Sequence, residues 1–231
     1  MTVSYVERDQ ASPDTNAFYD KAEERFELLL NIFKVFGHIP ELGAIFTDSV
    51  LAMLKDNELE WSTKELLILK ATQKNDCQYC VVQHEAVSKR LGISEEKIAD
   101  IDGDRYKTSP HYTEGEKALV ELTDQIGIDA NRISESLWSR VKEHYTEPQI
   151  VEAVYVITQY IAISKFGDAL GVVLEPVFKG LKPILQIEHH DVGWLPLLGL
   201  FDSDLKIPSW DTLKSQHSQE AHILTTLYRF V

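Results

Sequence analysis

Cysteine is nearly absent from this chain, whose 231 residues include only two, Cys77 and Cys80. A disulfide between residues so close in sequence closes a very short loop and restrains the unfolded chain little. This excludes a small secreted scaffold held together by disulfides. In a reducing compartment an isolated C-x-x-C pair is catalytic, redox-sensing or metal-binding, and the surrounding residues must separate these readings.

Basic residues are also scarce. The chain has 23 Lys and Arg against 37 Asp and Glu, which gives a formal charge of −14. That sign disfavours phosphate backbones and anionic lipid surfaces, so we expect neither nucleic acid nor a membrane as a partner. The first residues lack the basic start and apolar run of a signal peptide, and we find no stretch of roughly 20 apolar residues, so we expect a cytoplasmic protein.

Apolar periodicity predicts helices in the first third of the chain. Apolar positions recur at three- and four-residue spacing over residues 16–54, with a break at 37–40. Ser62 and Glu65 then have the spacing of a capping box, which predicts that a helix opens at Ser62.

The segment with both cysteines is predicted to be a second helix after a break at Asn75. Asp76 is a good N-cap residue for it, and Gly92 is typical of the left-handed residue that ends a helix. Both cysteines then lie in the first turns.

The rest of the chain also has helical signals, and no segment has a convincing strand pattern. Ser94 predicts the start of one helix, Thr113 with Glu116 of another, and Thr146 with Gln149 of a long one reaching Gly171. Residues 149–171 are nearly continuously apolar, so we expect a buried central helix. Residues 90–93 and 169–172 resemble each other, which hints at a degenerate repeat of two helical halves.

These patterns predict an all-α fold and two parts of the chain. The first is a helical domain over residues 1–183. The second is an irregular C-terminal tail over 184–231, packed on the domain or on a neighbouring subunit. Its apolar side chains suit a subunit interface, and they are Trp194, Leu195, Leu197, Leu198, Leu200 and Phe201.

Four reactive side chains are concentrated between Glu65 and His84, with the spacing E-x11-C-x2-C-x3-H. On one helix Cys77, Cys80 and His84 share a face, because seven residues return almost to the starting angle. A helix N-terminus lowers the pKa of a thiol, His84 can exchange a proton with Cys80, and a carboxylate can orient the imidazole. A second thiol can convert a sulfenic acid into a disulfide.

Glu65 can serve the thiols only if the chain reverses between them. On a straight helix Glu65 and Cys77 would lie about 18 Å apart, which is too far for proton transfer. We therefore expect a change of direction at Asn75 and Asp76.

Other readings of the same residues stay open. Glu65 could be only the capping partner of Ser62, His84 a structural histidine, and the cysteines inert buried thiols. The four side chains could also form a tetrahedral zinc site, although such sites usually take a second ligand pair from a separate part of the chain. A second metal candidate, set against a solvated loop, is His189-His190-Asp191.

At every spacing the motif resembles that of the redox-active members of the carboxymuconolactone decarboxylase and alkylhydroperoxidase D (AhpD) superfamily. The closest resemblance within it is to the peroxidase-related proteins. It extends to residues 37–42, the helix end at Leu91-Gly92 and the apolar segment 150–171, and so covers roughly residues 1–175. The resemblance implies an AhpD-like helical bundle.

The resemblance also implies roles for the four residues. Cys80 becomes the sulfenic acid, Cys77 is proton donor and resolving thiol, and Glu65 with His84 forms a proton relay. A peroxide is the implied substrate and a thiol or dithiol the implied reductant, with no cofactor and no metal. One departure is Tyr79, which stands where AhpD itself has a relay histidine directly before the second cysteine.

Family members commonly assemble as trimers or hexamers, so the resemblance implies a homo-oligomer. Two classes of function remain: a thiol peroxidase that turns over, and a redox-responsive or zinc-binding protein that does not. The lactone decarboxylases that name the superfamily lack the cysteine pair and are a further alternative.

Overall fold

The computed structural model describes residues 2–178 and 181–185, and within them the chain forms helices and connecting segments without a strand. The prediction of an all-α fold is thereby confirmed. The α-helices are α1 (Pro13–Phe26), α2 (Asn31–Phe36), α3 (Pro40–Met53), α4 (Trp61–Lys74), α5 (Gln78–Arg90), α6 (Glu95–Ala99), α7 (Glu114–Asp129), α8 (Glu135–His144) and α9 (Glu147–Leu170). Short 3₁₀ helices are η1 (Arg105–Lys107), η2 (Ala130–Arg132) and η3 (Pro176–Phe178).

Local capping signals fixed several helix starts as predicted. Ser94 Oγ accepts from Lys97 N at 3.2 Å at the start of α6. Thr113 and Glu116 form a reciprocal capping box on α7, and Thr146 N donates to Gln149 Oε1 at 2.9 Å on α9. These contacts satisfy backbone N–H groups that have no partner within the helix.

The predicted capping box at Ser62 is wrong. Helix α4 begins one residue earlier, at Trp61, and Trp61 N donates to Asp56 Oδ1 at 2.8 Å. Asp56, five residues upstream, thus supplies the acceptor that Ser62 was expected to provide. Glu65 is therefore free of a capping role.

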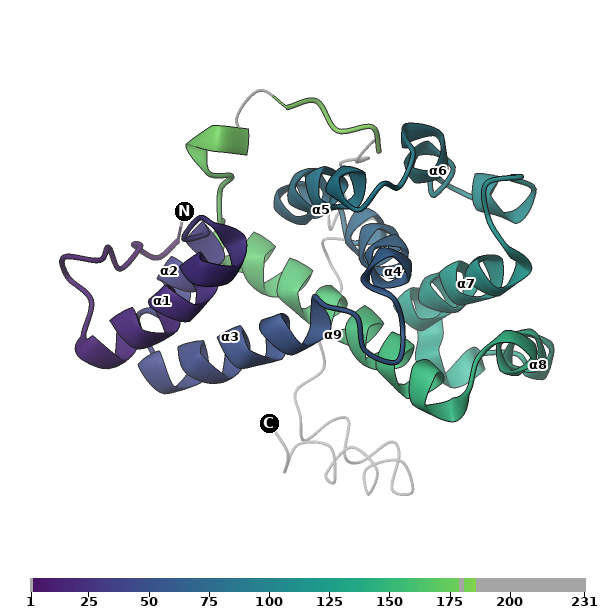
Figure 1. The fold of residues 1–231 in the computed structure, drawn as a ribbon, viewed down its shortest axis with the longest axis horizontal. Coiled ribbons are helices and arrows are strands. Elements are labelled where there is room, and N and C mark those ends of the chain that lie inside the picture. Colours follow the sequence, from purple (N-terminus) through teal and green to yellow (C-terminus); the bar gives the residue numbers. More distant parts are fainter. Residues whose placement is uncertain (1, 179–180, 186–231) are drawn as a thin grey trace, which may run out of the picture. The chain divides into compact units, whose positions relative to one another are not determined.

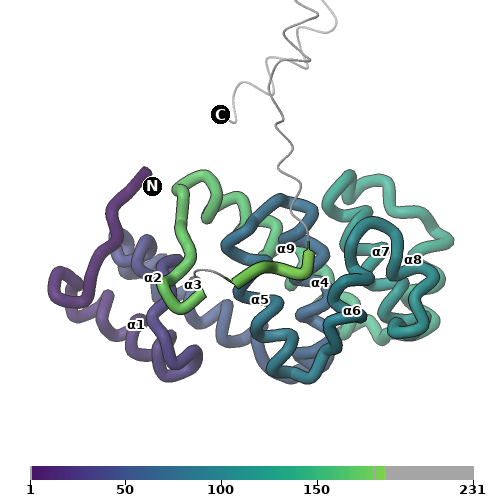
Figure 2. The backbone as a smooth tube through the Cα atoms, turned by 90° about the horizontal axis from the view of Figure 1, so that it is seen from above, coloured from purple at the N-terminus to yellow at the C-terminus, as the bar shows by residue number. Residues whose placement is uncertain are grey.

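Helix α4 is the buried centre of the described residues. It packs against α5, α7 and α9, while α1 packs against α3 (Figures 1 and 2). Its residues from Lys64 to Thr72 are all buried, and they divide between two apolar clusters. One cluster joins α4 to α1–α3 and the cysteine pair, and the other joins α4 to α6–α8.

Helix α9 is not the fully buried helix that its composition predicted. One face, including Ala153, Ile157 and Tyr160, packs inward, but Val151 is 69% exposed and Tyr155 47% exposed. The apolar side chains thus cover both faces of α9. The outer face is largely exposed, and there the Tyr155 hydroxyl hydrogen-bonds to that of Ser49 at 2.9 Å. Among the described residues, α9 alone is long and apolar enough to cross a membrane. The sequence analysis expected no such segment. The test uses only length and composition, and core helices of soluble proteins also pass it.

The two sequence segments that resembled each other end their helices in the same way. Gly92 and Gly171 both have positive φ, 83° and 66°. Ile93 N donates to Ser88 O at 3.0 Å and Val172 N to Gly167 O at 2.9 Å, the six-to-one bond of a Schellman motif.

The segment after α9 returns over α5 (Figure 2) and is held there by two buried carboxylates. Glu175 lies within the segment and accepts from Gln83 Nε2 of α5 at 2.7 Å. Glu85 of α5 accepts from the backbone N–H groups of Ile184 and Leu185, both at 2.8 Å. Residues 184 and 185 of the predicted tail therefore pack on the helices, and the rest of that tail, with its apolar side chains and His189-His190-Asp191, lies outside the described residues.

The buried pair Lys64–Glu152 joins α4 to α9. Lys64 is fully buried and its Nζ lies 2.8 Å from Glu152 Oε1. Replacing Lys64 by methionine is expected to lower the free energy of unfolding by about 3 kcal/mol, because the charge of Glu152 loses its cation. Lys21→Met is the control, since its pair with Asp48 is exposed at both ends and should change stability by less than about 0.5 kcal/mol. Equal losses in urea denaturation would contradict the prediction.

The same pair sets a pH dependence. Burial raises the pKa of the Glu152 carboxyl, but hydrogen bonds from Lys64, Leu59 N–H and Asn57 outweigh burial and hold it below its usual value. A lowered pKa stabilises the folded state above the unfolded-state pKa of about 4.3, and this contribution is lost as pH falls through the folded value. The difference between wild type and Lys64→Met should therefore shrink below about pH 4.

Candidate active site

The turn between α4 and α5 reverses the chain, as the motif required. Helix α4 ends at Lys74, Asp76 takes a left-handed conformation with φ 57°, and Cys77 N donates to Thr72 O at 3.1 Å. Helix α5 then runs back against α4. The predicted change of direction is confirmed, but Asp76 is not the N-cap: the cap of α5 is Cys77 itself.

Glu65 and His84 meet across this reversal. Glu65 is fully buried, and its Oε2 lies 2.7 Å from His84 Nδ1. Its other oxygen, Oε1, accepts from Trp61 Nε1 at 2.6 Å. Because a carboxylate only accepts, His84 Nδ1 carries the proton and Nε2 is left as the acceptor nitrogen.

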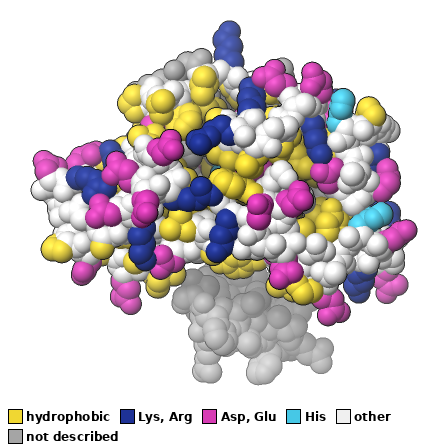
Figure 3. Space-filling model, in the orientation of Figure 1, with side chains coloured by type: hydrophobic (Ala, Val, Ile, Leu, Met, Phe, Trp, Pro, Cys, Tyr) yellow, Lys and Arg dark blue, Asp and Glu magenta, His cyan; other side chains and the backbone are white. Residues whose placement is uncertain are grey.

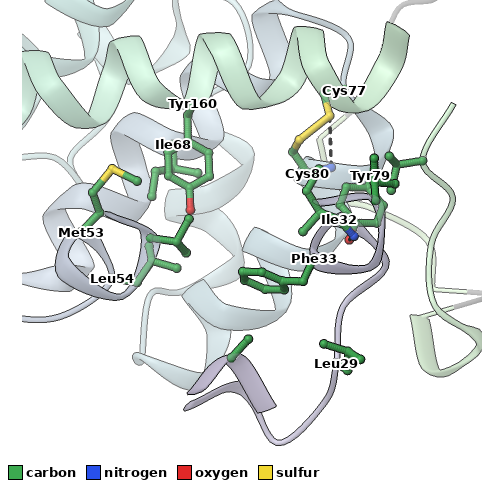
Figure 4. Close-up of a cluster of buried hydrophobic side chains, with 14 of the residues drawn as sticks. Leu29, Ile32, Phe33, Met53, Leu54, Ile68, Cys77, Tyr79, Cys80 and Tyr160 are labelled. Atoms are coloured by element: carbon green, nitrogen blue, oxygen red, sulfur yellow. Dashed lines mark hydrogen bonds between the residues drawn. A yellow bond between two sulfur atoms is a disulfide. The ribbon is translucent and has the colours of Figure 1, made fainter. Parts of the chain in front are cut away.

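Cys77 and Cys80 form a disulfide at the start of α5, with their Cα atoms 5.4 Å apart (Figure 4). Cys77 Sγ also accepts from Cys80 N at 3.3 Å. The sulfur of Cys77 thus occupies the position of a capping oxygen, where the free N–H groups and the helix dipole favour negative charge.

An apolar cavity of about 360 Å³ opens beside the pair. Cys80 and His84 line it, whereas Cys77 and Glu65 do not. Apolar side chains gather over the middle of the face drawn in Figure 3. The wall is mainly aliphatic and aromatic, and its members include Phe26, Leu28, Leu30, Phe33, Phe46, Trp61, Val87, Ile163 and Phe178.

Helix α9 adds two polar side chains that the sequence analysis missed. Ser164 is fully buried and its hydroxyl donates to Cys80 Sγ at 3.7 Å. The ring of Tyr160 meets that of His84 edge to face, with centroids 4.8 Å apart, and lines the cavity. Polar residues four positions apart on the inward face of an apolar helix are the signal that could have identified them.

The Tyr160 hydroxyl has no hydrogen-bond partner within the described ranges. Burial, with the charge of Glu65 as a second cause, raises the pKa of Tyr160 well above its usual value. The phenol therefore stays protonated at neutral pH and can donate a hydrogen bond into the cavity.

Tyr79, the departure from the AhpD pattern, belongs to a second buried network. Its hydroxyl donates to Glu175 Oε1 at 3.0 Å and accepts from Ile32 N at 3.2 Å. Asn31 N also donates to Glu175 Oε1, at 2.5 Å. Burial and the charge of Glu175 raise the pKa of Tyr79 well above its usual value. Tyr79 therefore ties α5 to the start of α2 and to the segment after α9.

The geometry does not favour the zinc reading of the four motif residues. Both oxygens of Glu65 already accept hydrogen bonds, from Trp61 and His84. No cluster of three or more His, Cys, Asp or Glu with the geometry of a metal site occurs in residues 2–178 and 181–185.

Fold and site together define an all-helical protein with a C-x-x-C pair at the start of a helix beside a buried carboxylate and histidine. A model of the carboxymuconolactone decarboxylase family matches residues 40–106. An uncharacterized protein of Bacillus subtilis (strain 168), YdfG, is 30% identical over 118 residues, which are 51% of this chain and 79% of the relative. The chain belongs to the carboxymuconolactone decarboxylase family, within the superfamily that includes AhpD.

Solved structures with the same fold confirm the predicted AhpD-like architecture. An AhpD-core, peroxidase-related protein from Ralstonia eutropha JMP134 has a TM-score of 0.67 at 17% identity, covering 77% of this chain and 93% of that one. A peroxidase-related protein from Silicibacter sp. TM1040 has a TM-score of 0.65 at 15% identity, with 74% and 91% covered. A variant of the debrominase Bmp8, in complex with 2,3,4-tribromopyrrole, has a TM-score of 0.67 at 16% identity, with 77% and 94% covered.

The different positions of the two sulfurs predict different reactivity. In the Cys77→Ser protein, Cys80 still borders the cavity, and peroxide treatment should leave a sulfenic acid there that dimedone labels. In the Cys80→Ser protein, labelling of the sealed Cys77 should be at least about tenfold slower. Peptide mass spectrometry reads out both. A label that appears only on Cys77 in the Cys80→Ser protein would reverse the two assignments.

Proposed function

We propose that the protein is a thiol peroxidase that reduces organic hydroperoxides with the Cys77–Cys80 dithiol. The observation that carries the proposal is that Cys80 borders an apolar cavity together with His84, whose other ring nitrogen is fixed by the buried Glu65. A passive redox sensor needs the thiol pair but has no need of a histidine and carboxylate arranged for proton transfer.

In the first step the Cys80 thiolate attacks the terminal oxygen of the hydroperoxide. An S–O bond forms, the O–O bond breaks, and the leaving alkoxide takes a proton to become an alcohol. His84 Nε2 receives the Cys80 proton before the attack and returns it to the alkoxide, while Glu65 holds the imidazole in the required tautomer. Ser164 donates to the Cys80 sulfur, and Tyr160 supplies a neutral donor on the cavity wall.

In the second step the Cys77 thiolate attacks the sulfur of the Cys80 sulfenic acid. The S–S bond forms and the S–O bond breaks, and the departing hydroxide takes up the proton that the Cys77 thiol gave up and leaves as water. The two cysteines lie in one helical turn with their Cα atoms 5.4 Å apart, so this step needs no rearrangement of the helices.

A thiol or dithiol reductant then restores the pair. Its thiolate reaches Cys80 from the cavity, and Cys77 leaves as a thiolate stabilised by the N-terminus of α5. A low leaving-group pKa accelerates thiol–disulfide exchange. Two electrons pass from the reductant to each hydroperoxide.

A halogenated heteroaromatic compound is the second candidate substrate. The debrominase Bmp8 shares the fold, and aromatic side chains, Phe26, Phe33 and Trp61, line the cavity here. Reductive debromination would also use the dithiol: the C–Br bond is replaced by C–H, bromide and a proton leave, and the pair becomes a disulfide. Released bromide distinguishes this reaction from alcohol formation.

Assembly and location complete the proposal. A homo-oligomer in the cytoplasm is what the family resemblance and the sequence favour. Exposed apolar side chains on α3 and α9 support self-association, and they are Leu42, Ile45, Val151 and Tyr155.

The wild-type protein should turn over hydroperoxide with a dithiol reductant. Mild peroxide treatment of the reduced protein should remove two hydrogen atoms from the peptide containing residues 77–80, and excess dithiol should restore them over repeated cycles. Alcohol product in excess of enzyme supports the peroxidase. A single oxidation without turnover indicates a redox-responsive protein, and bound zinc that resists peroxide oxidation indicates the metal alternative.

The Glu65→Gln protein should keep its fold, but its Cys80 thiol should be oxidised more slowly. Its amide oxygen can still accept from one neighbour, but the charge that favours the protonated Nδ1 of His84 is gone, so Cys80 oxidation should slow by about 10- to 100-fold. The control is Glu143→Gln, which removes an exposed carboxylate of α8 that does not line the cavity. Stopped-flow kinetics with matched circular dichroism decides this, and equal rates for the two variants would remove Glu65 from the relay.

A further inference from the structure

The charge of the cavity wall is opposite to that of the whole chain. The chain carries 37 acidic and 23 basic residues. Yet the described residues that line the cavity include two arginines, Arg25 and Arg90, and no aspartate or glutamate. Basic side chains stand beside the apolar area in Figure 3. An anion entering this cavity meets positive charge without a carboxylate on the wall to repel it.

The two arginines differ in the hydrogen bonds, ion pairs and ring contacts that their guanidinium groups already make. Arg25 Nη2 donates to Leu54 O at 2.7 Å, and its guanidinium lies 4.6 Å from the Trp61 ring centroid. Arg90 has neither an ion pair nor a hydrogen bond to any residue in the described ranges. Its neighbour Lys89, by contrast, pairs with Glu95 at 2.8 Å. Of the two arginines that line the cavity, Arg90 is therefore the one whose N–H donors can all bind a ligand.

Arg90 lies at one end of the face of α5 that carries the chemistry. Cys80, His84, Val87 and Arg90 all line the cavity, and Arg90 is the last residue of the helix. Ten residues separate Cys80 from Arg90, a rise of about 15 Å. Helical side chains lean toward the N-terminus, the direction in which Cys80 lies from Arg90. Apolar residues that line the same cavity include Val87 of α5 and Phe26, Leu28 and Phe178 from other segments.

We propose that the substrate is an amphipathic acid: a hydroperoxide with an apolar body and a carboxylate at the far end, which binds Arg90. This rests on the peroxidase function proposed above and adds its substrate class. The guanidinium offers a fork of N–H donors that matches a carboxylate, and the bond is strengthened at an apolar wall. The peroxide oxygen is transferred to Cys80 as described, and the product is the corresponding hydroxy acid.

A matched pair of substrates isolates the carboxylate. We would compare a medium-chain fatty-acid hydroperoxide with its methyl ester, both below their micellar concentrations, in the wild type, Arg90→Gln and Lys89→Gln proteins. Wild type should reduce the acid with a kcat/KM about tenfold or more above that of the ester. Arg90→Gln should lower kcat/KM for the acid and so bring the acid-to-ester ratio close to one. In the same variant kcat/KM for the ester should stay within about twofold of wild type. Lys89→Gln, which removes a charge one residue away, should keep the ratio.

Binding without chemistry gives an independent readout. The saturated fatty acid of the same length carries no peroxide, and calorimetry with the disulfide form should give a Kd that Arg90→Gln weakens about tenfold and Lys89→Gln leaves unchanged. The affinity should also fall as salt is raised, because the pair is near the surface.

The outcomes separate the two proposals. If acid and ester are reduced equally, or if Lys89→Gln lowers the ratio as much as Arg90→Gln does, the carboxylate site is wrong while the peroxidase stands. If neither hydroperoxide is reduced but the fatty acid binds through Arg90, the cavity takes an amphipathic acid and the peroxidase is wrong. If neither hydroperoxide is reduced and the acid does not bind, both proposals fail.

Discussion

The hydrogen bond between Glu65 and His84 is the contact on which the arrangement of the site depends. The two side chains are nineteen positions apart in sequence, and they meet only because α4 and α5 run antiparallel across a three-residue connection. A fully buried carboxylate is costly unless its oxygens are satisfied. Trp61 and His84 satisfy both, so the bond that orients the imidazole also allows Glu65 to lie inside the protein.

Helix α4 makes this possible because it is enclosed on every side. Its apolar residues belong to both hydrophobic clusters, and its buried charged residues, Lys64, Glu65 and Lys70, each have a defined partner. The neighbouring helices then surround the thiols: α5 carries them, α9 supplies Tyr160 and Ser164, and α1–α3 close the apolar side of the cavity. The thiols and their proton-transfer residues thus lie on or beside the buried helix α4.

The motif residues could be predicted because their information is local. The spacing from Glu65 to His84 identifies a turn and one helical face, and the caps at Ser94 and Thr113 depend on residues three positions away. The errors arose where distant contacts decide. Trp61 N donates to Asp56, so α4 begins earlier than predicted. Cys77 rather than Asp76 caps α5, because the Cys77 sulfur accepts from the N–H of Cys80. Ser164 and Glu175 lie far from the cysteines in sequence. A local pattern can indicate that Ser164 faces inward on α9, but it cannot show that Ser164 meets Cys80 or that Glu175 meets Tyr79.

Most positions of helix α5 are buried or line the cavity, and this limits the substitutions that the helix can accept. One face carries Cys80 and His84, another carries Glu85, which holds the returning backbone, and Val81 is packed in the core beneath. A substitution at any of these positions disturbs catalysis, anchoring or packing. The cavity wall formed by Phe26, Leu28 and Phe46 takes no part in proton transfer or in anchoring the segment after α9. Exchange of side chains on α1–α3 can therefore reshape the apolar part of the cavity while Cys77, Cys80 and His84 stay in place on α5.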